Sequence, residues 1–260
     1  MEFITVEARD HVTTITLNRP QVMNAINPQM HHELQAAFDA FAADPQQFVC
    51  VVTGAGERAF CAGSDLKAAV NSGVGQTAYP RNGYAGLIER FDLAKPVIAA
   101  VNGLALGGGF EIVLACDIVI ASETASFGLP EPLVGAVALG GGVHRLVRQI
   151  GLKPAMGMIL SSRRVSAQEG ERLGFVNEVV PAGELQAAVA RWCEQILRGA
   201  PLAIRASKEA AMRGLDEPSL ADAIRSQASY PAFVAWRGGE DTKEGPRAFA
   251  EKRPPVWKGR

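Results

Sequence analysis

The most apolar stretch of the chain runs from residue 96 to residue 121, and it limits the possible folds more than any other feature. Its length alone would allow it to cross a bilayer. However, Asn102, Glu111 and Asp117 interrupt it together with several glycines, and charges inside a membrane are costly. We therefore predict a buried strand, turn, helix and strand in this stretch, and no membrane span.

Short β-rich runs alternate with helical patterns along the first half of the chain, which favours parallel pairing of the strands. Helices dominate from about residue 153, and residues 66–90 look like an irregular surface segment, a candidate lid. The predicted strands are 3–6 paired with 12–17, then 48–53, 97–101 and 118–120. The predicted helices are 28–43, 167–173 with Ser166 as cap, 184–198, 201–213, 219–236 and 244–252.

Composition excludes several classes of partner. The 260 residues carry 26 basic and 27 acidic side chains, a net charge of −1, which gives no bulk attraction to nucleic acid or to an anionic membrane. The four cysteines lie far apart without a C-x-x-C pair, as is typical of reduced thiols in the cytoplasm. The start of the chain has no apolar core of a signal peptide. We therefore expect a cytoplasmic protein with no nucleic-acid partner and no membrane partner.

Several common chemistries lack their motifs. The chain has no phosphate-binding P-loop, no dinucleotide-binding glycine motif and no G-x-S-x-G nucleophile turn. His31 and His32 are adjacent on a predicted surface helix and cannot both face one metal, while His11 and His144 stand alone. We predict no metal site.

Two glycine-marked junctions, residues 60–66 and 104–111, remain as candidates for a site. In each, an apolar run meets small residues and then a helical stretch. The first N–H groups of a helix are unpaired and carry partial positive charge. Two such groups that converge on one point would form an oxyanion hole. Tight packing of turns is the alternative interpretation of the same glycines.

Two glutamates lie in apolar surroundings near these junctions. Glu111 is between Phe110 and Ile112, and Glu131 is within the apolar segment 127–133. A charge is rarely buried without a partner or a role. Two carboxyls beside an oxyanion hole suit proton transfer next to a thioester carbonyl. From the sequence context alone, each could equally be ion-paired or exposed.

Together these motifs resemble the crotonase superfamily, the enoyl-CoA hydratase/isomerase family, over nearly the whole chain. The matching segments are 18–20 with 24–25, 60–66, 95–103, 107–111, 116–117, 127–131 and 141–146. The resemblance implies an α/β fold, a crotonase-like spiral of ββα units over residues 1–195, followed by a helical oligomerisation region over residues 196–260. It also implies an acyl-CoA substrate and assembly as a homotrimer or homohexamer. No cofactor is implied, because coenzyme A is part of the substrate.

The same resemblance assigns roles to individual residues. The backbone N–H groups of Ser64 and Gly108 would bind the thioester oxygen, Glu111 would hold and activate water, and Glu131 would transfer the proton at the α-carbon. The residues implied along coenzyme A and the acyl group are Met23, Ala25, Ala62, Asp65, Leu66, Pro130, Leu139, Phe249 and Lys252, with Phe249 and Lys252 approaching from the C-terminal region of the same or another subunit. The implied activity is enoyl-CoA hydratase, a hydro-lyase.

Alternatives remain open within and outside this family. Leu139 stands where many hydratases have a glycine near the water and acyl site, which leaves the acyl group undefined. The last residues, 248–260, with 126–131, are similar to the carnitinyl-CoA dehydratases of the family, so a polar or branched acyl group is one alternative. An enoyl-CoA isomerase is another, although the pair Glu111 and Glu131 favours a hydratase. A non-catalytic acyl-CoA or RNA binder is a third.

Overall fold

The computed structural model describes residues 1–67 and 79–260, and it begins with the predicted pair of strands. Strands β1 (Ile4–Arg9) and β2 (Val12–Leu17) pair antiparallel. Asp10 and His11 form the turn between them, with positive φ angles of 48° and 68°. This is the left-handed backbone that a two-residue hairpin turn requires.

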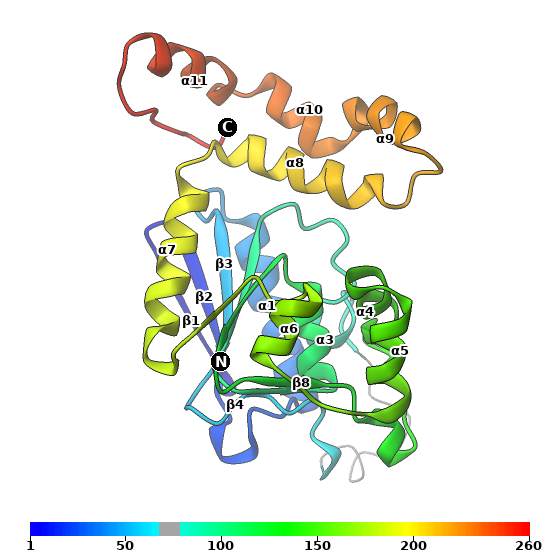
Figure 1. Cartoon of the computed structure of the whole chain (residues 1–260). Helices are drawn as coiled ribbons and strands as arrows, with labels where there is room; N and C mark the ends of the chain where they lie inside the picture. Colours follow the sequence, from blue (N-terminus) through cyan, green and yellow to red (C-terminus); the bar gives the residue numbers. More distant parts are fainter. Residues whose placement is uncertain (68–78) are drawn as a thin grey trace.

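The larger sheet continues from β2 with parallel strands, as the alternating pattern predicted. Its order is β1-β2-β3-β5-β7-β10, and every pair after β1-β2 is parallel. The added strands are β3 (Val49–Gly54), β5 (Val97–Val101), β7 (Ile118–Ser122) and β10 (Glu178–Val180). Both faces of this sheet are covered (Figure 1), since buried side chains of β3 alternate between two separate clusters of the core.

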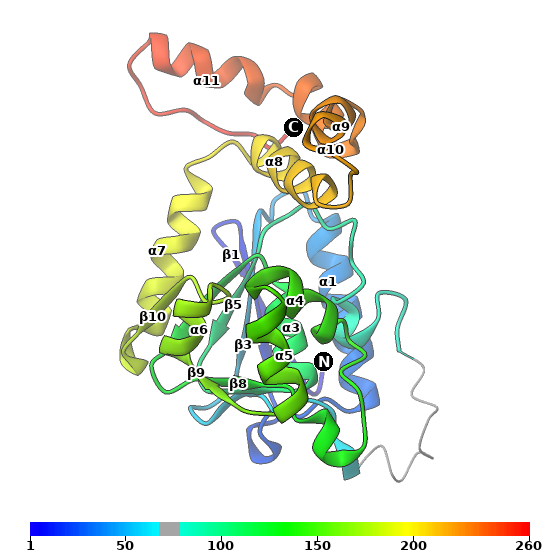
Figure 2. The same cartoon turned by 45° about the vertical axis from the view of Figure 1, so that its right-hand side comes forward.

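A second sheet of short strands was not predicted. Its order is β4-β6-β8-β9, and β8 runs across the direction of β3 in both views (Figure 2). Its strands are β4 (Ala59–Cys61), β6 (Leu104–Leu106), β8 (Ser126–Gly128) and β9 (Val165–Ser166). The chain thus places β3, β5 and β7 in the first sheet and β4, β6 and β8 in the second. This alternation is the spiral that the resemblance implies.

Helices fill the two sides of the larger sheet. Helix α1 (Pro28–Ala43) packs through Leu34, Phe38 and Phe41 into the same core cluster as α3 (Gly108–Ala115). Helix α7 (Leu185–Leu197) covers the other face through Leu185, Ala188, Val189 and Cys193. The remaining helices before α7 are α4 (Gly142–Ile150), α5 (Leu152–Ser161) and α6 (Ala167–Leu173). No helix in residues 1–67 and 79–260 is long and apolar enough to cross a membrane.

The C-terminal helices form a separate layer at the opposite end from β4 and β8 (Figures 1 and 2). They are α8 (Pro201–Gly214), α9 (Leu220–Ser226), α10 (Pro231–Gly238) and α11 (Asp241–Ala250). The boundary predicted at residue 195 falls inside the last turn of α7. The predicted single helix over 219–236 is wrong, because Tyr230 adopts extended backbone before Pro231. A residue before proline is pushed out of the helical region.

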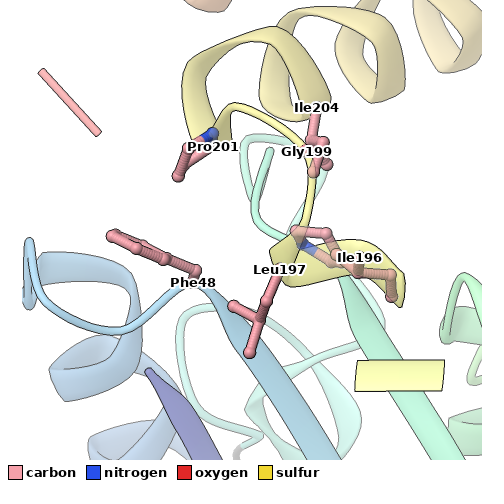
Figure 3. A pocket seen from close by; sticks show the side chains of 7 residues that line it. Phe48, Ile196, Leu197, Gly199, Pro201 and Ile204 are labelled. Atoms are coloured by element: carbon pink, nitrogen blue, oxygen red, sulfur yellow. The ribbon is translucent and has the colours of Figure 1, made fainter. Parts of the chain in front are cut away.

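A small apolar pocket marks the joint between this layer and the body (Figure 3). Phe48 of the body faces Pro201 and Ile204 of α8 there, and Ile196 and Leu197 end α7 beside them. Next to it, Lys208 of α8 forms an ion pair with Asp117 at 2.6 Å. The motif residue Asp117 also accepts a hydrogen bond from the Val97 N–H at 2.8 Å. Asp117 therefore fastens the C-terminal layer to the sheet.

Two sequence-based expectations need correction. His31 is buried, with 3% of its surface exposed, so the predicted surface helix turns this residue inward. In the segment 66–90, residues 68–78 lie outside the described residues, so the lid prediction for that part stays a prediction. The part from Tyr84 to Ile88 is buried in the core and is not a surface segment. Its burial depends on α1, against which it packs.

Candidate active site

The two glycine junctions lie in contact in the folded chain. Strands β4 and β6 are parallel neighbours, and each leads directly into one junction. At Gly63, whose φ is +91°, an added Cβ would lie 2.9 Å from the Leu106 carbonyl and 3.2 Å from the Gly108 nitrogen. Only a residue without a side chain fits such an approach. The short second sheet therefore brings Ser64 and Gly108 together.

The amide groups of Ser64 and Gly108 have the properties of an oxyanion hole. Gly108 is the first residue of α3, where a helix leaves its N–H groups unpaired and has partial positive charge. Within the described part of the chain, neither the Ser64 N–H nor the Gly108 N–H donates to another group. Two free amides on adjacent, rigid segments can stabilise negative charge on one oxygen. The prediction that places the oxyanion hole at these two residues thus has a consistent geometry.

Each glycine of the run 107–109 faces a different neighbour. An added Cβ would lie 3.2 Å from the Glu131 Oε1 at Gly107, 2.2 Å from the Tyr84 ring at Gly108, and 2.1 Å from the Cys61 carbonyl oxygen at Gly109. Gly107 also has φ +54° and ψ −127°, a conformation open mainly to glycine. The run therefore lets Glu131, Tyr84 and β4 all touch the start of α3.

A cluster of three phenylalanine rings, one of them on α3 itself, fixes the position of this helix. The rings of Phe110, Phe127 and Phe175 lie 5.2 to 5.4 Å apart, centroid to centroid, at tilted or edge-to-face angles. All three are buried, and such aromatic pairs add stabilisation beyond their buried area. Phe110 is on α3 and Phe127 on β8, so the cluster holds the start of α3 relative to the strand that leads to Glu131.

Glu111 is buried, one of the alternatives that the sequence left open, and its carboxylate is held by a neighbouring loop. Only 3% of its surface is exposed, and its Oε1 accepts a hydrogen bond from the Gly142 N–H at 2.8 Å. Burial raises the pKa of this carboxyl from 4.5 to about 7, and the nearby Glu131 adds to the rise, whereas the N–H groups of Gly142 and Gly140 oppose it. The Glu111 carboxyl can therefore exchange a proton near neutral pH.

Glu131 lies on the other side of the same helix start. It is the first residue of the short 3₁₀ helix η3 (Glu131–Val134), directly after Pro130. Its Oε2 is buried and has no hydrogen-bond partner among the described residues. Burial raises the pKa of Glu131 as well. A buried carboxylate oxygen without a partner needs a function or a ligand to account for it. The fold thus brings Glu111 and Glu131 to the same helix end.

The residues predicted along coenzyme A form two adjacent backbone segments. The Ala62 N–H donates a hydrogen bond to the Met23 carbonyl at 3.0 Å. Ile26 and Ser64 pair as an isolated parallel β-bridge. Arg19 fastens the two segments through its ion pair with Asp65 at 3.0 Å. Met23, Ala25, Ala62, Asp65 and Leu66 therefore lie in one region next to Ser64, and Leu66 is 57% exposed.

The other predicted contact residues lie in two places. Pro130 adjoins Glu131, and Leu139 lies between buried Ala138 and buried Gly140 with 82% of its surface exposed. Phe249 is in the last turn of α11 and Lys252 lies two residues beyond its end, and α11 lies at the opposite end of the molecule from β4, the strand that leads to Ser64 (Figure 1). One chain does not bring these two residues to the site, so their contact with a neighbouring copy stays a prediction.

Sequence reasoning missed Tyr84 and the residue that holds it, His31. The Tyr84 ring lies over Gly108, and the Ser64 hydroxyl donates to the Tyr84 hydroxyl at 3.3 Å. His31 packs edge-to-face on this ring, with centroids 4.6 Å apart. No local pattern marks either residue. The only signal was the tyrosine content of an irregular segment between two motifs.

This constellation, two buried carboxyls beside a backbone oxyanion hole on a ββα spiral, defines a class of acid–base enzyme acting next to a carbonyl. The family model described as enoyl-CoA hydratase/isomerase matches residues 7–260. The chain therefore belongs to the enoyl-CoA hydratase/isomerase family of enzymes.

Individual relatives narrow the comparison. A carnitinyl-CoA dehydratase of Proteus mirabilis is 45% identical over 257 residues, which cover 97% of each chain. Enoyl-CoA hydratase structures from Bacillus anthracis and Mycobacterium tuberculosis are 37% and 36% identical, each comparison covers 100% of both chains, and the TM-scores are 0.90 and 0.92. The fold is thus shared with hydratases, and the sequence is similar to that of named dehydratases.

Proposed function

We propose that this chain catalyses the reversible addition of water to a 2-enoyl-CoA thioester. The observation that carries the proposal is the position of Glu111 and Glu131 on two sides of the α3 start, next to the free amides of Ser64 and Gly108. The family membership makes an acyl-CoA the expected substrate. Coenzyme A would lie along the segments of Met23–Ala25 and Ala62–Leu66, with the thioester oxygen between the two amides.

In the direction of dehydration, the ionised Glu131 takes the α-proton of a 3-hydroxyacyl-CoA. The electron pair of the C–H bond forms a π bond between the α-carbon and the thioester carbon, and the carbonyl π electrons move to oxygen. The two amides stabilise the negative charge that develops on that oxygen. The 3-hydroxyl then leaves as water with a proton from Glu111. One proton is gained by Glu131 and one is lost by Glu111, so the charge of the pair is conserved.

Dehydration requires Glu131 to be ionised and Glu111 to be protonated. The pKa of Glu111, raised to about 7 by burial, allows this carboxyl to hold the proton that it must donate near neutral pH. Hydration uses the opposite proton arrangement by microscopic reversibility. Two carboxyls and two amides suffice for this chemistry. We infer that no cofactor is needed, and activity should therefore persist in the presence of a metal chelator.

A panel of CoA thioesters tests the proposal. The loss of the conjugated enoyl-thioester absorbance would be followed for short, long, aromatic and betaine-bearing enoyl-CoA esters. Hydration of at least one ester, abolished in Glu131→Gln, is expected. If the wild-type protein hydrates none of the panel but moves the double bond of a 3-enoyl-CoA, the isomerase alternative replaces this proposal. Tight binding of acyl-CoA without turnover would support the non-catalytic alternative.

A carnitinyl-CoA dehydratase is the second candidate, supported by 45% identity to proteins of that name. Exposed Leu139, beside the loop that holds Glu111, also allows an acyl group other than a simple fatty acyl chain. The betaine-bearing ester decides between the candidates, because a specialised dehydratase would prefer it to crotonyl-CoA by a large factor in kcat/KM.

We also propose that the chain self-associates as a trimer or as a pair of trimers. Large apolar side chains at the end of α8 and on α9 are exposed in the single chain, among them Leu215, which directly follows α8, at 74%, and Leu220 and Ile224 of α9 at 77% and 57%. Exposed apolar patches often mark subunit interfaces. Light scattering at micromolar concentration tests this, and a monomeric mass would contradict it.

A further inference from the structure

Tyr84 places a phenol at the oxyanion hole. The residue is 3% exposed, and it lies in the short 3₁₀ turn η2 (Tyr84–Gly86). An added Cβ on Gly108 would be 2.4 Å from the Tyr84 hydroxyl oxygen and 2.2 Å from the ring carbon that carries it. The polar end of the side chain therefore rests on Gly108, one of the two residues whose amides form the oxyanion hole.

The hydroxyl of Tyr84 retains a proton that it can donate. The Ser64 hydroxyl donates to the phenol oxygen at 3.3 Å, which leaves the phenol's own hydrogen available. Among the hydrogen bonds of residues 1–67 and 79–260, none has the Tyr84 hydroxyl as donor. Burial raises the pKa of Tyr84 well above its usual value, and the charge of Glu111 acts in the same direction. The phenol is therefore a neutral donor, and a buried donor without an acceptor points to a ligand.

His31 fixes the turn that presents this phenol. Its Nδ1 accepts a hydrogen bond from the Ala85 N–H at 2.9 Å, and Ala85 has a φ of +55°, which is uncommon for a residue with a side chain. Burial lowers the pKa of His31 to about 4, so the ring stays neutral and its Nδ1 remains an acceptor at neutral pH. The next residue, Gly86, also packs closely, since an added Cβ there would be 2.5 Å from the Gln35 Cα.

We propose that Tyr84 donates a third hydrogen bond to the thioester oxygen as it becomes an enolate, and that His31 is the positioning residue that holds Tyr84 in place. This inference rests on the proposed function. Glu131 takes the α-proton, the C–H electron pair forms the new carbon–carbon π bond, and the carbonyl π electrons move to oxygen. The phenol keeps its proton and stabilises the charge beside the amides of Ser64 and Gly108. A Tyr84 that only lined the acyl pocket would need its ring but not its hydroxyl, so loss of the hydroxyl alone separates the two roles.

The test measures the enolate directly. Acetoacetyl-CoA ionises to an enolate that absorbs in the near ultraviolet, so the pKa of the bound thioester can be titrated by absorbance without any turnover. Tyr84→Phe removes the hydroxyl and keeps the ring. Loss of one preorganised donor should raise the pKa of the bound thioester by about two units and lower turnover by about 10²-fold, with KM changed much less.

Tyr79→Phe is the matched control. Tyr79 belongs to the same aromatic cluster, with its ring 5.7 Å from that of Tyr84, but it is 49% exposed. This variant should leave the pKa of bound acetoacetyl-CoA unchanged. If Tyr84→Phe also leaves it unchanged, Tyr84 is not a donor and the proposal fails. If the wild-type protein itself does not lower the pKa of bound acetoacetyl-CoA, the oxyanion hole of the proposed function fails instead.

The role of His31 has its own readout. His31→Phe should raise the pKa of bound acetoacetyl-CoA when Tyr84 is present. It should add little in the Tyr84→Phe variant, because both changes remove the same hydrogen bond from Tyr84 to the thioester oxygen. His31→Asn, whose side-chain oxygen can accept from the Ala85 N–H, should restore part of the effect. Equal and additive shifts in both backgrounds would show that His31 does not act through Tyr84.

Discussion

Replacing Glu111 by glutamine should make the protein more stable at alkaline pH and far less active. The folded state raises the pKa of this carboxyl from 4.5 to about 7, chiefly through burial. Below pH 4.5 the carboxyl is protonated in the folded and unfolded states, so burial carries no ionisation cost. The cost grows as the pH rises from 4.5 and is fully present above pH 7, where the folded state must hold a buried charge.

The magnitude follows from that pKa difference. A rise from 4.5 to about 7 corresponds to roughly 3 kcal/mol of destabilisation at pH 8. Glutamine keeps a carbonyl oxygen for the Gly142 N–H, but its amide group faces the N–H of Gly140 and loses about 1 kcal/mol there. Glu111→Gln should therefore gain about 2 kcal/mol in free energy of unfolding at pH 8 and about none at pH 5, while turnover falls ~10²-fold.

Denaturant unfolding of both proteins at pH 5 and pH 8, at one protein concentration, measures this difference. Glu171→Gln, at an exposed glutamate of α6, is the matched control and should show no comparable dependence on pH. If the stability difference between Glu111→Gln and wild type is the same at both pH values, the Glu111 carboxylate is not destabilising. If turnover is near normal, Glu111 has no catalytic role.

Four further outcomes are expected. The kcat/KM for dehydration should fall as the pH rises through about 7, because Glu111 must be protonated, and a rate independent of pH from 6 to 8 would contradict this. Glu131→Gln should lower turnover by ~10²-fold or more with normal folding by circular dichroism, and near-normal turnover would remove its role as base. Gly108→Pro removes the N–H and also displaces Tyr84, since an added Cβ would lie 2.2 Å from the Tyr84 ring, so turnover should fall by at least ~10²–10³-fold, whereas Ser64→Ala should stay within about tenfold. Leu139→Gly should change kcat/KM for long and short acyl groups unequally in the ester panel, and a uniform change would exclude a contact with the acyl group.

Features fixed by local chemistry could be predicted from the sequence. Asn27 caps helix α1, because its side chain accepts a hydrogen bond from the Met30 N–H, and Pro28 is the first residue of the helix. Ser166 likewise caps α6. The parallel strands of the larger sheet are buried on both faces. Their sequences are nearly continuous apolar runs, which is the pattern that such strands show. The apolar surroundings of Glu111 and Glu131 were enough to mark them as unusual carboxylates.

Features that depend on distant contacts could not. Strands of three residues such as β4 and β6 are too short to show an alternating pattern, and their glycines indicate turns. Tyr84 enters the site only because its turn packs on His31, 53 positions earlier in the chain. The break before Pro231 was visible in principle, since proline disfavours helical backbone at the preceding residue, but the helical spacing of apolar residues on both sides concealed it.

The burial that makes Glu111 reactive also requires a rigid support. The N–H groups of Gly142 and Gly140 favour the charged carboxylate, yet burial outweighs them and the pKa still rises. An eight-residue helix with a costly buried charge in its first turn would not hold its position by helix propensity alone. Its stability must come from packing, which the cluster of Phe110, Phe127 and Phe175 supplies. The same cluster sets the position of Gly108 relative to Glu131, so loosening it should affect both the oxyanion hole and the proton transfer.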